Sequence, residues 1–214
     1  MAIHFPNATF IHIPRTAGKS FELWTENNIS NYDNRHGNCK LDVAEQTWTD
    51  LGTVFTFVRN PYDRLVSIFH YMGQQARYRI DLKAKWLETD PTVHSTLEED
   101  IKTYGLYRKG FEHWLNNAQE QYSPVEDINF WTTAGLTSQV DWLCSKTPQL
   151  VIKVEELADK FIQVQDLLNC HVPLPKINTS EHGHYIDYYN MSTKRIATKI
   201  VQKDLDAFGY TFQC

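Results

Sequence analysis

The sequence predicts an α/β fold built on parallel strands, and a repeated pattern carries this prediction. Residues 53–58 (TVFTFV) are nearly all β-forming, which is typical of a strand buried on both faces. This strand ends at Arg59, and apolar residues at helical spacing follow from Tyr62 onward. Residues 8–27 show the same order of strand, arginine-containing turn and helix. Two such units favour parallel strands with ligands at their carboxyl ends.

The remaining elements follow from apolar periodicity along the chain. Residues 73–110 have a less regular pattern, and no linker or internal repeat interrupts the chain, so we expect a single domain over residues 1–214. The expected elements are a strand at 8–13, helices at 19–27 and 43–48, a strand at 53–58, helices from 62 and at 111–117, a strand at 150–154 followed by a helix, and a last helix at 193–208.

Composition narrows the class of protein. The formal net charge is −5, which disfavours nucleic acid as a partner. With 42% hydrophobic residues and 13% aromatic residues, the chain is expected to be ordered. No apolar run approaches a membrane span and no leader is evident, so we expect a soluble cytoplasmic protein without a membrane partner. The four cysteines are widely spaced and are expected to be free thiols.

An anion site is predicted where the first strand gives way to the first helix. Backbone N–H groups and the positive end of the helix dipole point at this position. The loop adds two cations and two hydroxyl groups, so its natural ligand is a phosphate or a sulfate. Its candidate binding residues are Pro14, Arg15, Thr16, Ala17, Gly18, Lys19 and Ser20.

This loop departs from the triphosphate-binding Walker A pattern. Gly18, Lys19 and Ser20 match the end of GxxxxGK[ST], but Ile13 stands where the first glycine is required. A P-loop-type kinase or NTPase using ATP and Mg²⁺ remains an alternative function. A nucleotide-binding module without catalytic activity is a further alternative.

A second motif begins in the strand at 53–58, where residues 57–67 read FVRNPYDRLVS. Arg59 stands at the strand end, and Ser67 lies a little over one helical turn into the next helix. A guanidinium and a hydroxyl in these positions can converge on one oxyanion. The alternative for Arg64 is an ion pair with Asp63 or another carboxylate that fixes the turn.

Together, the two motifs resemble those of sulfotransferases that use 3′-phosphoadenosine 5′-phosphosulfate (PAPS), in the carbohydrate (Golgi-type, heparan sulfate 2-O-sulfotransferase-like) branch, here as a small soluble member. The loop at 14–20 is similar to the 5′-phosphosulfate loop, and residues 57–67 are similar to the 3′-phosphate motif. The resemblance implies a P-loop-like three-layer fold with a central parallel sheet flanked by helices. Weaker similarities lie at 151–157, 176–180, 187–189 and 204–212.

The resemblance also implies a reaction, in which a sulfuryl group passes from PAPS to a hydroxyl of a small-molecule or glycan acceptor and adenosine 3′,5′-bisphosphate (PAP) is released. The loop at 14–20 with Arg59 and Ser67 would bind the donor, and no metal is required. Related enzymes place a histidine between the two phosphate motifs, and His36, the one histidine between residues 21 and 58, is the candidate base, because histidine as a residue type titrates near neutrality. His12 is expected to have a structural role.

Three questions stay open at this point. The family usually has lysine where this chain has Arg15, so either Arg15 or Lys19 is the catalytic cation at the leaving oxygen. The acceptor is expected to bind within residues 73–149, which contain four tryptophans that could equally belong to the core: Trp86, Trp114, Trp131 and Trp142. The oligomeric state is not predicted.

Overall fold

The computed structural model describes residues 2–34, 39–87, 94–121, 136–175 and 182–213. This part of the chain forms two compact units, each assembled from segments that are distant in the sequence. The first unit comprises Met1–Arg64, Thr137–Thr179 and Val201–Phe212, and the second comprises Leu65–Leu136, Ser180–Ile200 and Gln213–Cys214.

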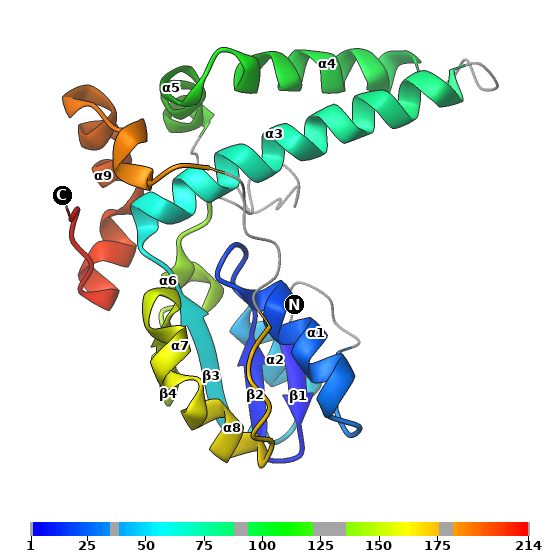
Figure 1. Cartoon of the computed structure of the whole chain (residues 1–214), viewed down its shortest axis with the longest axis vertical. Coiled ribbons are helices and arrows are strands. Elements are labelled where there is room, and N and C mark those ends of the chain that lie inside the picture. Colours follow the sequence, from blue (N-terminus) through cyan, green and yellow to red (C-terminus); the bar gives the residue numbers. More distant parts are fainter. Residues whose placement is uncertain (1, 35–38, 88–93, 122–135, 176–181, 214) are drawn as a thin grey trace. The chain divides into compact units, whose positions relative to one another are not determined.

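A four-stranded sheet with the order β1-β2-β3-β4 forms the centre of the first unit (Figure 1). β2 pairs in parallel with β3, and β3 with β4, whereas β1 pairs antiparallel with β2. The predicted α/β class with a mainly parallel sheet is therefore confirmed, and β1 is an edge strand that the sequence did not reveal. The strands are β1 (Ala2–Phe5), β2 (Ala8–Ile11), β3 (Thr53–Val58) and β4 (Leu150–Lys153).

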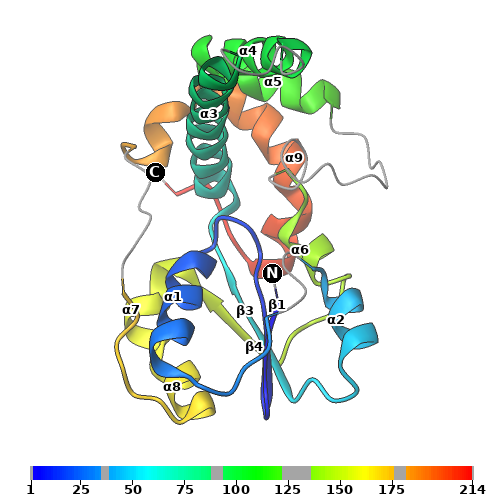
Figure 2. The ribbon, with the colours of Figure 1, turned by 90° about the vertical axis from the view of Figure 1, so that its right-hand side faces the viewer.

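Helices cover both faces of this sheet and complete a three-layer arrangement. Figure 2 shows α1, α7 and α8 on one face and α2 and α6 on the other. The helices are α1 (Gly18–Asn28), α2 (Leu41–Thr47), α6 (Gln139–Trp142), α7 (Leu157–Lys160) and α8 (Ile162–Leu168), with a short 3-10 turn η2 (Val154–Glu156) before α7.

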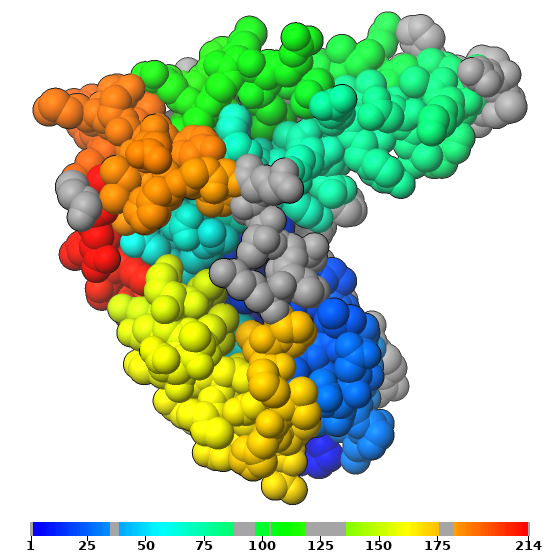
Figure 3. All heavy atoms as spheres, in the orientation of Figure 1, coloured from blue at the N-terminus to red at the C-terminus, as the bar shows by residue number. Residues whose placement is uncertain are grey.

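An aromatic cluster fills the space between the sheet and the layer of α1, α7 and α8. The ring of Phe10 from β2 lies 4.5 Å from that of Phe21 in α1, centroid to centroid, and Trp24 meets Phe161 edge-on at 5.3 Å. Fully burying each such side chain stabilises the fold by about 1.5–3 kcal/mol. In the space-filling view, α1 and the α7–α8 segment form neighbouring parts of the surface (Figure 3).

Helices make up the second unit, and two of its helices begin or end in the first. α3 (Pro61–Trp86) runs unbroken for 26 residues, and the boundary between the units falls after Arg64, near its start. The other helices are α4 (His94–Arg108), α5 (Phe111–Gln121), the 3-10 turn η3 (Tyr185–Tyr188) and α9 (Met191–Phe208), whose last residues belong to the first unit.

The regularity of α3 beyond residue 73 differs from the sequence-based expectation, and a polar contact explains why. Asp100 of α4 accepts from Arg79 at 3.0 Å and pairs with Lys83 at 2.6 Å. Burial alone would raise the pKa of Asp100, but the hydrogen bonds from Lys83 and Arg79 lower it. Contacts between charged residues join α3 to α4 here, so no apolar stripe marks the helix in the sequence. Among the described residues, no helix is long and apolar enough to cross a membrane.

Candidate anion-binding site

The loop between β2 and α1 is held in an unusual backbone conformation. Arg15 and Ala17 both adopt left-handed backbone angles, with φ of 69° and 65°. The Thr16 hydroxyl is buried and donates to the carbonyl oxygen of Ile13 at 2.7 Å. The carbonyl of Ala17 then accepts from the backbone N–H groups of Ser20 and Phe21, at 3.0 and 3.2 Å, and α1 begins.

This conformation suits an anion for two reasons. The first N–H groups of a helix have no acceptor within the helix, and α1 is 11 residues long, so its dipole favours negative charge at this end. Left-handed residues beside right-handed ones also turn successive N–H groups toward a common concave side. No carboxylate occurs within residues 14–20. The residues of this loop that are predicted to bind an anion therefore lie together at the carboxyl end of β2.

Gly18 is required at the start of α1 because a histidine ring lies against it. A Cβ atom built on Gly18 would lie only 1.9 Å from Cδ2 and Nε2 of His12. Burial lowers the pKa of His12 well below its usual value, and the charges of Lys19 and Arg15 lower it further. His12 therefore packs beneath the loop as a neutral ring, which agrees with the structural role expected for it.

Lys19 projects from the first turn of α1 and is largely exposed, with 65% of its side chain accessible. Its ammonium group forms an ion pair with Glu22, one turn further along the helix. The positive charge that Lys19 contributes is thus partly balanced by a carboxylate on the same helix face.

Arg59 stands where β3 ends, as the sequence predicted, and contacts both motifs. Its Nε donates to Oδ2 of Asp63 at 2.7 Å. Its Nη1 reaches the carbonyl oxygen of Arg15 at 3.5 Å. The second motif is therefore tied to the first loop through the arginine that the sequence singled out, and 18% of its side chain remains accessible.

Arg64 has a different role from the ion pair considered for it, because Asp63 binds Arg59 instead. The Arg64 side chain is almost completely buried. Its Nε donates to the carbonyl oxygen of Pro14 at 2.9 Å, and Nη1 donates to that of Thr137 at 3.0 Å. Arg64 thus holds the backbone where the first loop begins.

The structure describes only some of the other predicted residues. Ser67 is buried in the second turn of α3, one helical turn beyond Asp63, and belongs to the second unit. The candidate base His36 lies outside the described residues, as does Trp131. Trp114 and Trp142 are buried, whereas 49% of Trp86 is exposed. Within the described ranges, no group of three or more histidine, cysteine or acidic residues could hold a metal ion.

Residues outside both motifs fix the turn after β3. Glu155, just beyond β4, accepts from the backbone N–H of Asn60 at 2.7 Å. Its other oxygen accepts from the Tyr210 hydroxyl at 2.9 Å, and burial, followed by the Glu155 charge, raises the pKa of that hydroxyl. The Gln139 side chain binds the backbone of Arg59. Contacts between a side chain and a distant backbone leave no periodic signal in the sequence.

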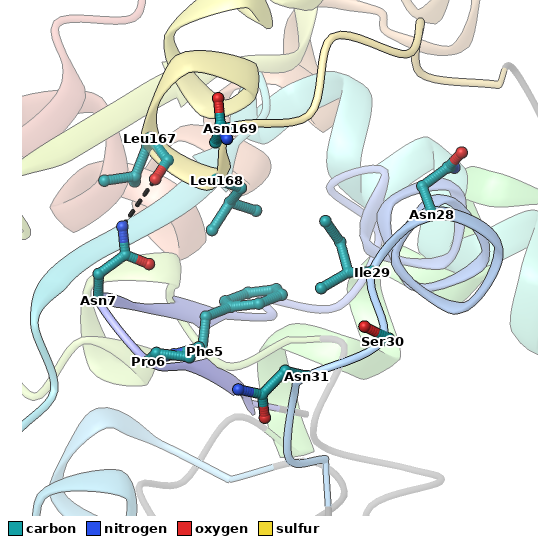
Figure 4. Close-up of a pocket in the computed structure, with 10 residues that line it drawn as sticks. All are labelled: Phe5, Pro6, Asn7, Asn28, Ile29, Ser30, Asn31, Leu167, Leu168 and Asn169. Carbon is teal, nitrogen blue, oxygen red and sulfur yellow. Dashed lines mark hydrogen bonds between the residues drawn. The ribbon is translucent and has the colours of Figure 1, made fainter.

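A cavity of about 390 Å³ lies at the opposite end of the sheet, where β1 turns into β2 and where α1 and α8 end (Figure 4). None of the side chains lining it is charged. Its lining residues are Phe5, Pro6, Asn7, Asn28, Ile29, Ser30, Asn31, Leu167, Leu168 and Asn169.

The fold and the site define an α/β protein with a cationic loop, a candidate anion site, at the carboxyl end of β2 and an arginine at the carboxyl end of the adjacent parallel strand β3. A family model described as the sulfotransferase family matches residues 8–211, nearly the whole chain. The chain therefore belongs to the sulfotransferase family. No curated protein and no solved structure matches it.

Proposed function

We propose that this sulfotransferase uses PAPS as its donor and transfers the sulfuryl group to a hydroxyl of a carbohydrate acceptor, with release of PAP. The observation that carries this proposal is the link between the two motifs. Arg59 of the second motif contacts the backbone of the first loop at Arg15. A donor with anionic groups at both its 5′ and 3′ positions needs two such sites at adjacent strand ends.

The chemistry of the residues fits this donor. The loop from Pro14 to Ser20 would bind the 5′-phosphosulfate through its N–H groups and its cations, whereas the Thr16 hydroxyl, predicted as a further donor, is already bonded to the Ile13 carbonyl oxygen. Arg59, which Asp63 orients, and Ser67 would bind the 3′-phosphate, as the resemblance of residues 57–67 to the 3′-phosphate motif implies. Bound PAPS supplies the sulfuryl group and leaves as PAP.

The chain's own residues supply the remaining steps of the proposed reaction. His36 would take the proton of the acceptor hydroxyl as its oxygen bonds to sulfur and the bond from sulfur to the phosphate oxygen breaks. Arg15 and Lys19 would stabilise the negative charge that develops on the leaving oxygen. The proposal of a carbohydrate acceptor rests on the resemblance of the two motifs to the carbohydrate branch.

Ligand-dependent thermal shifts test the choice of donor. Ligands that bind only the folded state raise the melting temperature in proportion to their binding free energy. We expect PAP and PAPS to stabilise the protein without Mg²⁺, and to do so more strongly than ADP or ATP. Stabilisation by ATP that requires Mg²⁺ and exceeds that by PAP would refute the proposal and favour a kinase or NTPase.

An arginine substitution tests the second motif directly. Hydrogen bonds to charged groups contribute about 1.5–3 kcal/mol each, so Arg59→Ala should weaken PAP binding by roughly 10- to 150-fold. Arg77→Ala, at an exposed position of α3 in the second unit, is the matched control and should leave PAP affinity unchanged. Equal PAP affinity in Arg59→Ala and the wild type would show that the 3′-phosphate binds elsewhere.

A further inference from the structure

Gln139 is fully buried and binds both backbone polar groups of Arg59. Its Oε1 accepts from the Arg59 N–H at 2.9 Å, and its Nε2 donates to the Arg59 carbonyl oxygen at 2.9 Å. Both partners lie in the first unit and are 80 residues apart in the sequence. The Gln139 amide therefore pairs with the backbone at the end of β3 as a neighbouring strand would.

Gln139 is itself held by a buried carboxylate from the last helix. Asp204 of α9 is 1% exposed. Its Oδ2 accepts from the Gln139 N–H at 3.0 Å, and its Oδ1 accepts from the Ser138 hydroxyl at 2.5 Å and from the Val140 N–H at 3.1 Å. One carboxylate thus satisfies three donors at the start of α6.

These contacts form a continuous path from α9 to the guanidinium-bearing residue of the second motif. Asp204 fixes the first residue of α6, whose side chain fixes the peptide groups of Arg59. The adjoining residue Thr137 also accepts from Arg64, which holds the first loop at Pro14. The segment 137–140, which belongs to neither motif, is therefore hydrogen-bonded to two residues of the second motif, and one of these, Arg64, also binds the first loop.

We propose that Gln139 and Asp204 are positioning residues that set the backbone of Arg59 and thereby the affinity of the site for the donor's 3′-phosphate. This inference rests on the proposed function, because it takes the Arg59 side chain as the ligand of that phosphate. A guanidinium fork binds a phosphate in a defined geometry, so a small rotation of the residue weakens the contact. Neither Gln139 nor Asp204 is required to touch the donor.

The test compares two ligands that differ only in the 3′-phosphate, PAP and adenosine 5′-monophosphate (AMP), by calorimetric titration. The variants are Gln139→Met, which keeps the length of the side chain without its amide, and Asp204→Asn, which removes the charge at constant size. We expect each variant to lose about tenfold in PAP affinity while its AMP affinity stays within about twofold, so that the preference for PAP falls.

The chain provides an exposed pair with the same two residue types as a control. Gln202 and Asp206 lie on α9, and the Gln202 amide donates to the Asp206 carboxylate at 2.7 Å near the surface. Gln202→Met and Asp206→Asn repeat both chemical changes without touching α6 or Arg59. We expect both control variants to retain the wild-type preference for PAP.

The outcomes separate this inference from the proposed function. Equal affinities of the wild type for PAP and AMP would refute a 3′-phosphate site, and with it the proposed function. A wild-type preference for PAP that persists in Gln139→Met and Asp204→Asn would overturn only the positioning role. Equal losses for PAP and AMP, or failure of both variants to fold, would also overturn it, since the residues would then support the whole unit rather than Arg59.

Discussion

Replacing Gly18 with alanine should displace the ring of His12 and distort the anion-binding loop. The added Cβ would lie 1.9 Å from two ring atoms of His12 and 2.5 Å from Cγ. Favourable contacts between carbon atoms lie at about 3.5–4.0 Å, so the ring or the start of α1 must move by roughly 1.5 Å or more. The His12 ring stacks on Phe10 of β2 at 6.1 Å, so a shift of the ring disturbs this contact as well as the loop.

The expected cost follows from this overlap. Inserting a methyl group into a packed interior typically costs about 1–3 kcal/mol. For a chain of this length, each kcal/mol lowers the melting temperature by about 2–4 °C, so Gly18→Ala should lose roughly 2–12 °C. The N–H groups of the first turn move with the loop, and PAP affinity should fall in parallel.

Gly105→Ala is the matched control for this substitution. Gly105 lies within α4, and a Cβ there would meet nothing within 4 Å. Alanine in a helix interior is about 1 kcal/mol more favourable than glycine, so this variant should gain roughly 2–4 °C by scanning calorimetry. The same chemical change should therefore give opposite signs at the two positions.

A double variant isolates the contact responsible. If the His12 ring causes the loss, Gly18→Ala should be nearly neutral in a His12→Ala background, and the two substitutions should couple by at least 1 kcal/mol. Additive effects, or a Gly18→Ala variant as stable as the wild type, would refute the reasoning.

Three further substitutions have expected outcomes. Ala17→Gly removes a Cβ from a left-handed residue and should raise the free energy of unfolding by about 1 kcal/mol, whereas Ala84→Gly on the exposed side of α3 should lower it by a similar amount, both measured by urea unfolding. Burial lowers the pKa of His12 in the folded state. The stability that the neutral ring contributes is present above about pH 6.5 and is lost as the pH falls toward that lowered pKa. A His12→Gln variant should therefore lose less stability between about pH 7.5 and 5 than the wild type. Glu22→Gln removes the carboxylate partner of Lys19 and should strengthen PAP binding a few-fold if Lys19 contacts the donor; unchanged PAP affinity would exclude Lys19 from that contact.

The elements predicted best are those in which the residue types within the element itself indicate that it is buried. β3 occupies 53–58 as expected, because a strand buried on both faces needs an unbroken run of β-forming residues. β1 was missed because one of its four residues is His4, which interrupts its apolar run. The ring of His4 stacks on Trp48 at 4.8 Å, a contact that no local pattern predicts.

The site shows the same division between local and distant information. The loop at 14–20 and Arg59 were predicted from residue type and spacing, because helix N-termini and cations create anion sites wherever they meet. Gln139 and Asp204 were not predicted, since their contribution depends on backbone contacts with residues 80 and 65 positions away. The binding roles of the loop at 14–20, of Arg59 and of Ser67, and the catalytic roles of His36, Arg15 and Lys19, stay predictions.

Arg59 and Lys19 are two of the cations at the proposed donor site, in a chain with a net charge of −5. Each of these two cations has an acidic partner nearby, Asp63 for Arg59 and Glu22 for Lys19, which offsets part of the positive charge of each motif. Asp63 engages only Nε of Arg59, and Nη1 makes just a long 3.5 Å contact with Arg15. The carboxylate therefore holds the guanidinium plane while leaving its other donors available for stronger bonds. Directed donors of this kind, rather than a broad positive potential, would give the site both its affinity and its selectivity for two separately placed anionic groups.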